Sequence, residues 1–131
     1  MYSRQGSGAL VVVGTPIGNL GDLPPRAVDA LQGADVIACE DTRHTRKLLT
    51  HAGISGPRLV AVHEHNEAES ARRVIDWIES GLRVALVTDA GMPGVSDPGE
   101  RVVAAVVDAG LPVEVVPGPT AAVTALAVSG L

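Results

Sequence analysis

Aromatic residues and cysteine are almost absent from this chain of 131 residues, which contains no Phe, one Tyr, one Trp and one Cys. Hydrophobic residues still make up 46% of it, so its core must be aliphatic, built from Val, Leu, Ile and Ala. A single cysteine excludes a disulfide framework within the chain and fits a reducing compartment. Because Cys39 ends an apolar run, we expect it to be a core residue.

Positive charge and long apolar runs are also scarce. The formal net charge is −5, which argues against a domain that binds nucleic acid with its whole surface, although a local basic patch is compatible with it. No apolar run reaches the roughly 20 residues of a membrane span, and the first eight residues lack the apolar segment of a signal peptide. We therefore expect a cytoplasmic protein with a flexible tail over residues 1–8 and one domain over residues 9–131.

Five short apolar runs rich in β-branched residues predict strands. They cover Leu10–Val13, Val36–Cys39, Leu59–Val62, Val84–Val87 and Val113–Val116, and their Val-rich composition is typical of strands buried on both faces. Helix-like segments alternate with these runs. The pattern predicts an α/β domain with a largely parallel five-stranded sheet flanked by helices on both faces. In such sheets, ligands bind beyond the carboxyl ends of the strands.

Capping residues and apolar periodicity predict the helices in more detail. Thr42 is a candidate cap for the second helix, and Asn66 with Glu69 has the spacing of a capping box for the third. The faces expected to point inward are Ala71, Val74, Ile75 and Ile78 in the third helix and Val102, Val103, Val106 and Val107 in the fourth. Residues 119–131 contain no charge and predict an apolar helix. A second domain or subunit absent from this chain would cover it, and the alternative is a helix buried at the centre of its own domain.

Three loops rich in glycine and proline follow the first, fourth and fifth predicted strands. Residues 14–22 allow the backbone to approach a ligand closely but lack the dinucleotide and Walker patterns. In residues 88–99, Asp89 can accept a hydrogen bond from an ammonium group, and the loop's backbone groups need partners. In residues 117–121, Thr120 lies where a helix start favours a carboxylate. Each loop can also be read as a plain turn.

The loops after the second and third predicted strands are polar. Glu40 and Asp41 can hold a ribose or act as a base, and the basic cluster that follows them can bind phosphate. The alternative is a capped helix with a solvated basic face. His63 and His65 with Glu64 are a weak metal pattern, so we predict no metal site but a polar lining for a cleft, with Asn66 as a helix cap.

Taken together, five motifs resemble the tetrapyrrole-methylase superfamily of S-adenosylmethionine-dependent methyltransferases. They are residues 15–20, 40–45, 63–67, 89–99 and 117–121, and the resemblance extends from Leu10 to Leu131. It is to the N-terminal domain of the branch that methylates the ribose 2′-hydroxyl of a cytidine in small-subunit ribosomal RNA. It implies S-adenosyl-L-methionine as cofactor, ribosomal RNA as partner, a homodimer for the full-length protein, and neither a metal nor a membrane.

The resemblance also implies site residues. The cofactor would be bound by Pro16, Asp89, Ala90, Gly91, Gly94, Val95, Thr120 and Ala121. By position, the candidate catalytic residues are Glu40, Asp41, Arg43 and His63, with Glu64 as a further candidate base and Arg46 as a further phosphate ligand. Two alternatives stay open: a methyltransferase that acts on a tetrapyrrole ring, and a metabolite-binding domain without catalysis.

Overall fold

The fold is described by a computed structural model over residues 8–14, 23–87 and 99–116. Strands and helices alternate along these ranges. They are β1 (Ala9–Val13), α1 (Pro25–Gln32), β2 (Val36–Cys39), α2 (Thr42–His51), β3 (Arg58–Ala61), α3 (Glu67–Glu79), β4 (Arg83–Val87), α4 (Gly99–Asp108) and β5 (Val113–Val116). The predicted α/β order is confirmed, and no predicted strand is off by more than one residue at either end. The predicted helix over residues 119–131 lies outside the described residues.

The five strands form one parallel sheet in the order β3-β2-β4-β1-β5. β1 lies between β4 and β5, and β4 lies between β1 and β2. The register places the last residues of all five strands in one row across the sheet: Ala61, Cys39, Val87, Val13 and Val116. The chain therefore leaves every strand at the same edge, which we call the carboxyl edge.

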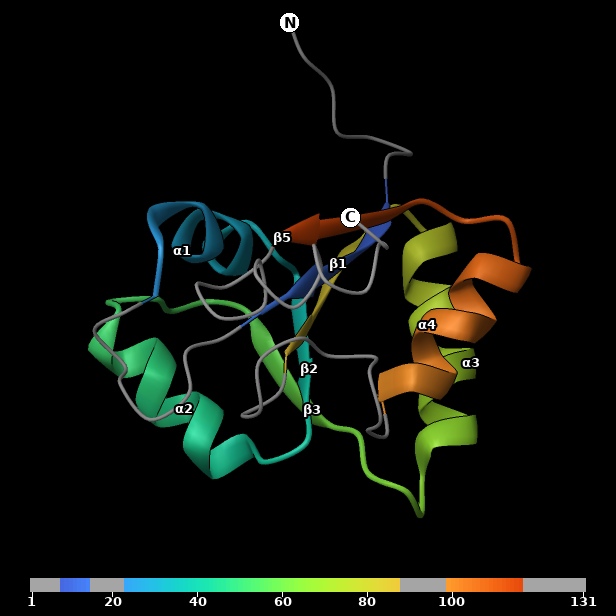
Figure 1. The fold of residues 1–131 in the computed structure, drawn as a ribbon, viewed down its shortest axis with the longest axis horizontal. Helices are drawn as coiled ribbons and strands as arrows, with labels where there is room; N and C mark the ends of the chain where they lie inside the picture. Colours follow the sequence, from blue (N-terminus) through green and yellow to red (C-terminus); the bar gives the residue numbers. More distant parts are fainter. Residues whose placement is uncertain (1–7, 15–22, 88–98, 117–131) are drawn as a thin grey trace, which may run out of the picture.

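Helices cover both faces of the sheet, with α1 and α2 on one side and α3 and α4 on the other (Figure 1). Alternation along β1 divides its side chains between two cores. Leu10 and Val12 pack with α3 and α4, whereas Val11 and Val13 pack with α1 and α2. The buried hydrophobic residues of the described part are aliphatic apart from Cys39, which is 1% exposed, as predicted.

The prediction that the strands are buried on both faces is correct for β1 and β2, and for β4 beyond its first residue. It is wrong for β3 and β5, whose residues are exposed or half-buried. These two strands are the edges of the sheet, so each has a neighbouring strand on one side only within the described residues. Val115 in β5 is 52% exposed for this reason.

Three details of the helices differ from the sequence-based expectations. α2 is capped by Asp41, and Thr42 is its first residue. Asn66 lies at the N-cap position of α3, but its side chain makes no capping hydrogen bond. Val107 was expected to face inward with Val106, yet it is 57% exposed. The first two differences change which side-chain hydrogen bonds stabilise the loops at the carboxyl edge.

The backbone is already closely packed one residue before β1. Gly8, which we assigned to the flexible tail, is buried, and a Cβ atom there would collide with the carbonyl oxygens of Ile78 and Leu82. Glycine is required at this position because the backbone passes directly against the end of α3. In the described ranges, no helix has the length and apolar character needed to cross a lipid bilayer.

Candidate functional site at the carboxyl edge of the sheet

Strands β1 and β4 end side by side at the carboxyl edge. They are neighbours, and Val13 pairs with Val87 at their last positions. Helix α1, which follows β1, lies on one face of the sheet, and α4, which follows β4, lies on the other. Open α/β sheets bind ligands beyond the carboxyl ends of neighbouring strands whose helices lie on opposite faces in this way.

The backbone at this point is closely packed. Gly14, the first residue after β1, is buried, and its N–H donates to the carbonyl oxygen of Val116 at 2.9 Å. This bond ties the exit of β1 to the end of β5. Because β4 lies on the other side of β1, the attachment points of three predicted ligand-binding loops lie on three adjacent strands.

The predicted cofactor-binding residues themselves lie outside the described residues. They are Pro16, Asp89, Ala90, Gly91, Gly94, Val95, Thr120 and Ala121. Their distance along the chain from the sheet is short: Pro16 is two residues beyond Gly14, and Asp89 is two residues beyond Val87. The described residues therefore supply the frame of this site.

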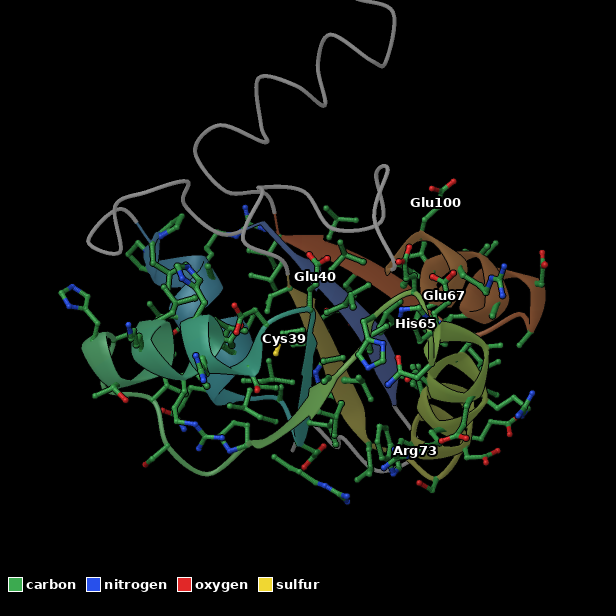
Figure 2. The ribbon with its side chains drawn as sticks, turned by 90° about the horizontal axis from the view of Figure 1, so that it is seen from below. Cys39, Glu40, His65, Glu67, Arg73 and Glu100 are labelled. Carbon is green, nitrogen blue, oxygen red and sulfur yellow. The ribbon has the colours of Figure 1, made fainter. Side chains whose placement is uncertain are left out.

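Glu40 is the first residue beyond β2, directly after Cys39. Cys39 pairs with Val87, so Glu40 leaves the sheet beside the end of β4. Its side chain is exposed and points away from the strands at the carboxyl edge, whereas the Cys39 sulfur is enclosed (Figure 2). Of the four candidate catalytic residues, Glu40 is the one that directly follows a strand adjoining β4.

Asp41 has a structural contact that the sequence analysis gave to Thr42. One carboxylate oxygen of Asp41 accepts hydrogen bonds from the backbone N–H groups of Arg43, at 2.9 Å, and His44, at 3.3 Å. It thereby satisfies two of the N–H groups that are left without partners at the start of a helix. Arg43 follows in the first turn of α2 and is exposed.

His63 lies at the carboxyl end of edge strand β3, so it is one strand farther from β4 than Glu40. Its loop is held by Asn66, whose side-chain oxygen accepts from the His63 N–H at 2.8 Å and whose amide nitrogen donates to the Ala61 carbonyl at 3.1 Å. This role of Asn66 was not predicted, because the sequence pattern indicated only a helix cap; Asn side chains also bond nearby backbone groups in this way.

The histidines of this loop are exposed and in contact. The rings of His63 and His65 are 5.9 Å apart between centroids, and His65 Nε2 lies 3.9 Å from Glu64 Oε1. Within residues 8–14, 23–87 and 99–116, no group of three or more His, Cys, Asp or Glu side chains is placed to hold a metal ion.

One side of α2 carries a row of exposed polar and basic side chains. Arg43, Arg46, Lys47, Thr50 and His51 line a shallow, open groove of about 600 Å³, and we call them the α2 basic face. Thr45, Leu48 and Leu49 form the opposite, buried side. The basic cluster expected after Asp41 comprises Arg43, His44, Arg46 and Lys47, and three of these lie on the face, whereas His44 does not line it. Thr50 and His51 were not predicted, although the helical period places them on the same side.

Comparison with known proteins places this fold in a family. A family model described as tetrapyrrole (corrin/porphyrin) methylases matches residues 9–131. The chain belongs to this family. Among solved structures, uroporphyrin-III C-methyltransferase from Thermus thermophilus is similar to this chain, with a TM-score of 0.64 and 28% identity over 88% of the chain and 48% of that protein.

Curated relatives in this family are more similar still. Ribosomal RNA small subunit methyltransferase I from Xylella fastidiosa is 55% identical over 95% of the chain. The protein of the same name from Vibrio cholerae is 52% identical over 97% of the chain. The chain spans 45% and 44% of the length of these two relatives, which is less than half of each.

Proposed function

We propose that this chain forms the N-terminal domain of a methyltransferase. Its substrate would be the ribose 2′-hydroxyl of a cytidine in small-subunit ribosomal RNA, and its cofactor S-adenosyl-L-methionine. The observation that carries the proposal is identity of 52–55% to relatives named ribosomal RNA small subunit methyltransferase I, over nearly the whole chain. Membership of the methylase family supports the reaction type. The protein would act in the cytoplasm, and the homodimer expected from the resemblance remains a prediction for the full-length protein.

Two observations support a cofactor site at the ends of β1 and β4. Open α/β sheets take up ligands at this position, and the buried residue directly after β1 is Gly14, which has no side chain. Pro16, with the Asp89–Val95 and Thr120–Ala121 segments attached at β4 and β5, would line one wall. The cofactor, when bound, supplies a methyl group on a positively charged sulfur, which is a good leaving group.

Because the leaving group is already activated, the chain's residues contribute mainly by alignment of the attacking oxygen. A base that takes up the hydroxyl proton contributes further. We propose Glu40 as this base, since its exposed carboxylate leaves the sheet beside β4. Asp41 is less suited because one of its oxygens holds two N–H groups of α2. His63 lies one strand farther away.

A tetrapyrrole ring is the second candidate substrate, supported by the similarity to uroporphyrin-III C-methyltransferase. The RNA substrate is favoured because identity to the ribosomal RNA methyltransferases is about twice as high. The full-length protein, incubated with tritium-labelled cofactor, undermethylated small ribosomal subunits and a precursor porphyrinoid, distinguishes them. We expect label in the RNA at a cytidine ribose. Label in the porphyrinoid alone would establish the second candidate.

The metabolite-binding alternative is tested by Asp89→Ala in the full-length protein. We expect this substitution to weaken cofactor binding and to slow RNA methylation, because Asp89 would accept a hydrogen bond from the cofactor's ammonium group. Wild-type cofactor affinity together with a wild-type methylation rate in this variant would show that the site is elsewhere.

A further inference from the structure

The charge of α2 is of one sign. Three of the chain's ten Lys and Arg residues lie in this helix, together with none of its fifteen Asp and Glu residues. All three cations, Arg43, Arg46 and Lys47, are exposed. In a chain with a formal net charge of −5, such a helix creates a local positive field that the rest of the surface opposes.

Four of the arginines elsewhere in the described residues have partners that use their charge. Arg83 pairs with Glu114 at 2.6 Å, and Arg101 lies 3.6 Å from Glu67. Arg58 and Arg73 both lie over the ring of Trp77. The ion pairs found within these ranges include none of the α2 cations. The helix α2 therefore presents three exposed cations together to an external anion.

The side chains of the α2 basic face are those expected of a phosphate-binding surface. The face consists of two Arg, one Lys, one Thr and one His, without the Trp or Tyr that, together with Arg, anchor many protein interfaces. Arg, Lys and Thr side chains are instead the usual ligands of nucleic-acid phosphates. The apolar side chains of α2, Leu48 and Leu49, are buried against the sheet.

We propose that the α2 basic face binds the sugar-phosphate backbone of the RNA substrate beside the target nucleotide. This inference rests on the proposed function. α2 begins directly after Glu40 and Asp41, so the face starts next to the proposed base and extends away from the carboxyl edge. From Arg43 to His51 the helix rises roughly 12 Å, about the length of three or four stacked nucleotides at ~3.4 Å each. Arg46, Lys47 and His51 lie beyond the two acidic residues and form the main contact.

The test uses the full-length protein with Arg46→Gln and Lys47→Gln combined. Its matched control combines Arg72→Gln and Arg73→Gln, which removes two adjacent exposed cations from α3 on the opposite face of the sheet. Urea unfolding checks that both variants are folded, since the control loses the contact of Arg73 with Trp77. Binding of a short RNA that contains the target cytidine is measured by fluorescence anisotropy from low to high salt.

We expect the α2 variant to bind this RNA about tenfold more weakly or worse, and the slope of log affinity against log salt to fall by about 1.4, as two lost phosphate contacts require. In methylation assays its KM for RNA rises while kcat is retained. The control keeps wild-type affinity, slope and KM.

An equal loss of RNA affinity in the α2 variant and the control would overturn the proposal, because it would show that affinity depends on net charge alone. Unchanged affinity in the α2 variant, or a loss of kcat with unchanged KM, would overturn it as well. If the wild-type protein methylates the RNA in these cases, the assignment of RNA binding to the α2 basic face is wrong, but the proposed function stands. A wild-type protein that neither binds nor methylates the RNA refutes the proposed function too.

Discussion

At the scale of single residues, Glu40 and Asp41 are neighbours with different surroundings. Asp41 holds the first turn of α2 through two backbone hydrogen bonds. Glu40 precedes the helix, is exposed at the carboxyl edge, and follows a strand that adjoins β4. Two carboxylates that the sequence presents as equivalent are therefore separated by their contacts into a structural residue and a candidate base.

Substitution of each carboxylate by its amide tests this division. Glu40→Gln should lower kcat for RNA methylation by about 10²–10⁴-fold, the range of general base catalysis. Asp41→Asn should retain kcat, because Asn caps helices about as well as Asp, whereas Asp41→Ala should lower the free energy of unfolding by about 1 kcal/mol. Single-turnover rates and urea unfolding measure the two effects. A large loss of kcat in Asp41→Asn would assign the proton transfer to Asp41 instead.

At the scale of elements, α4 contains two adjacent valines that differ in burial. Val106 is fully buried and Val107 is 57% exposed, although they are adjacent residues of the same type in one helix. Val106→Ala should lower the free energy of unfolding by about 2 kcal/mol, from lost burial plus a cavity. Val107→Ala should change it by less than about 0.5 kcal/mol. Urea unfolding of the two variants measures the difference, and equal losses would show that Val107 is covered in solution.

Periodicity along the chain was sufficient to predict the strands, their alternation with helices and the aliphatic core. It could not predict the exposure of Val115, because β5 is an edge of the sheet and strand order is not encoded in local pattern. It also did not distinguish exposed Val107 from its buried neighbour Val106, because both read as apolar positions of α4. The same holds for the site. Motif spacing named Glu40 and Asp41 together, but only the hydrogen bonds to the start of α2 tell them apart.

At the scale of the whole molecule, the chain corresponds to less than half of its ribosomal RNA methyltransferase relatives. Ligand pockets enclose most of a small molecule's surface, and we propose that this domain supplies only one wall. The isolated 131-residue chain should therefore bind S-adenosyl-L-methionine weakly and transfer no methyl group. Titration calorimetry checks this against the full-length protein, and micromolar affinity of the isolated chain would contradict it.

The position of β1 between β4 and β5 has a consequence for biosynthesis. β1 is the first strand to be made, yet both neighbours, residues 83–87 and 113–116, follow it by more than half the length of the chain. Contacts between such distant segments form slowly, and unpaired apolar strands are prone to aggregate. A nascent chain shorter than residue 83 thus exposes both edges of Ala9–Val13, the kind of segment that general chaperones bind. β1, an inner strand of the sheet, therefore pairs late in synthesis, although it emerges before both of its neighbours.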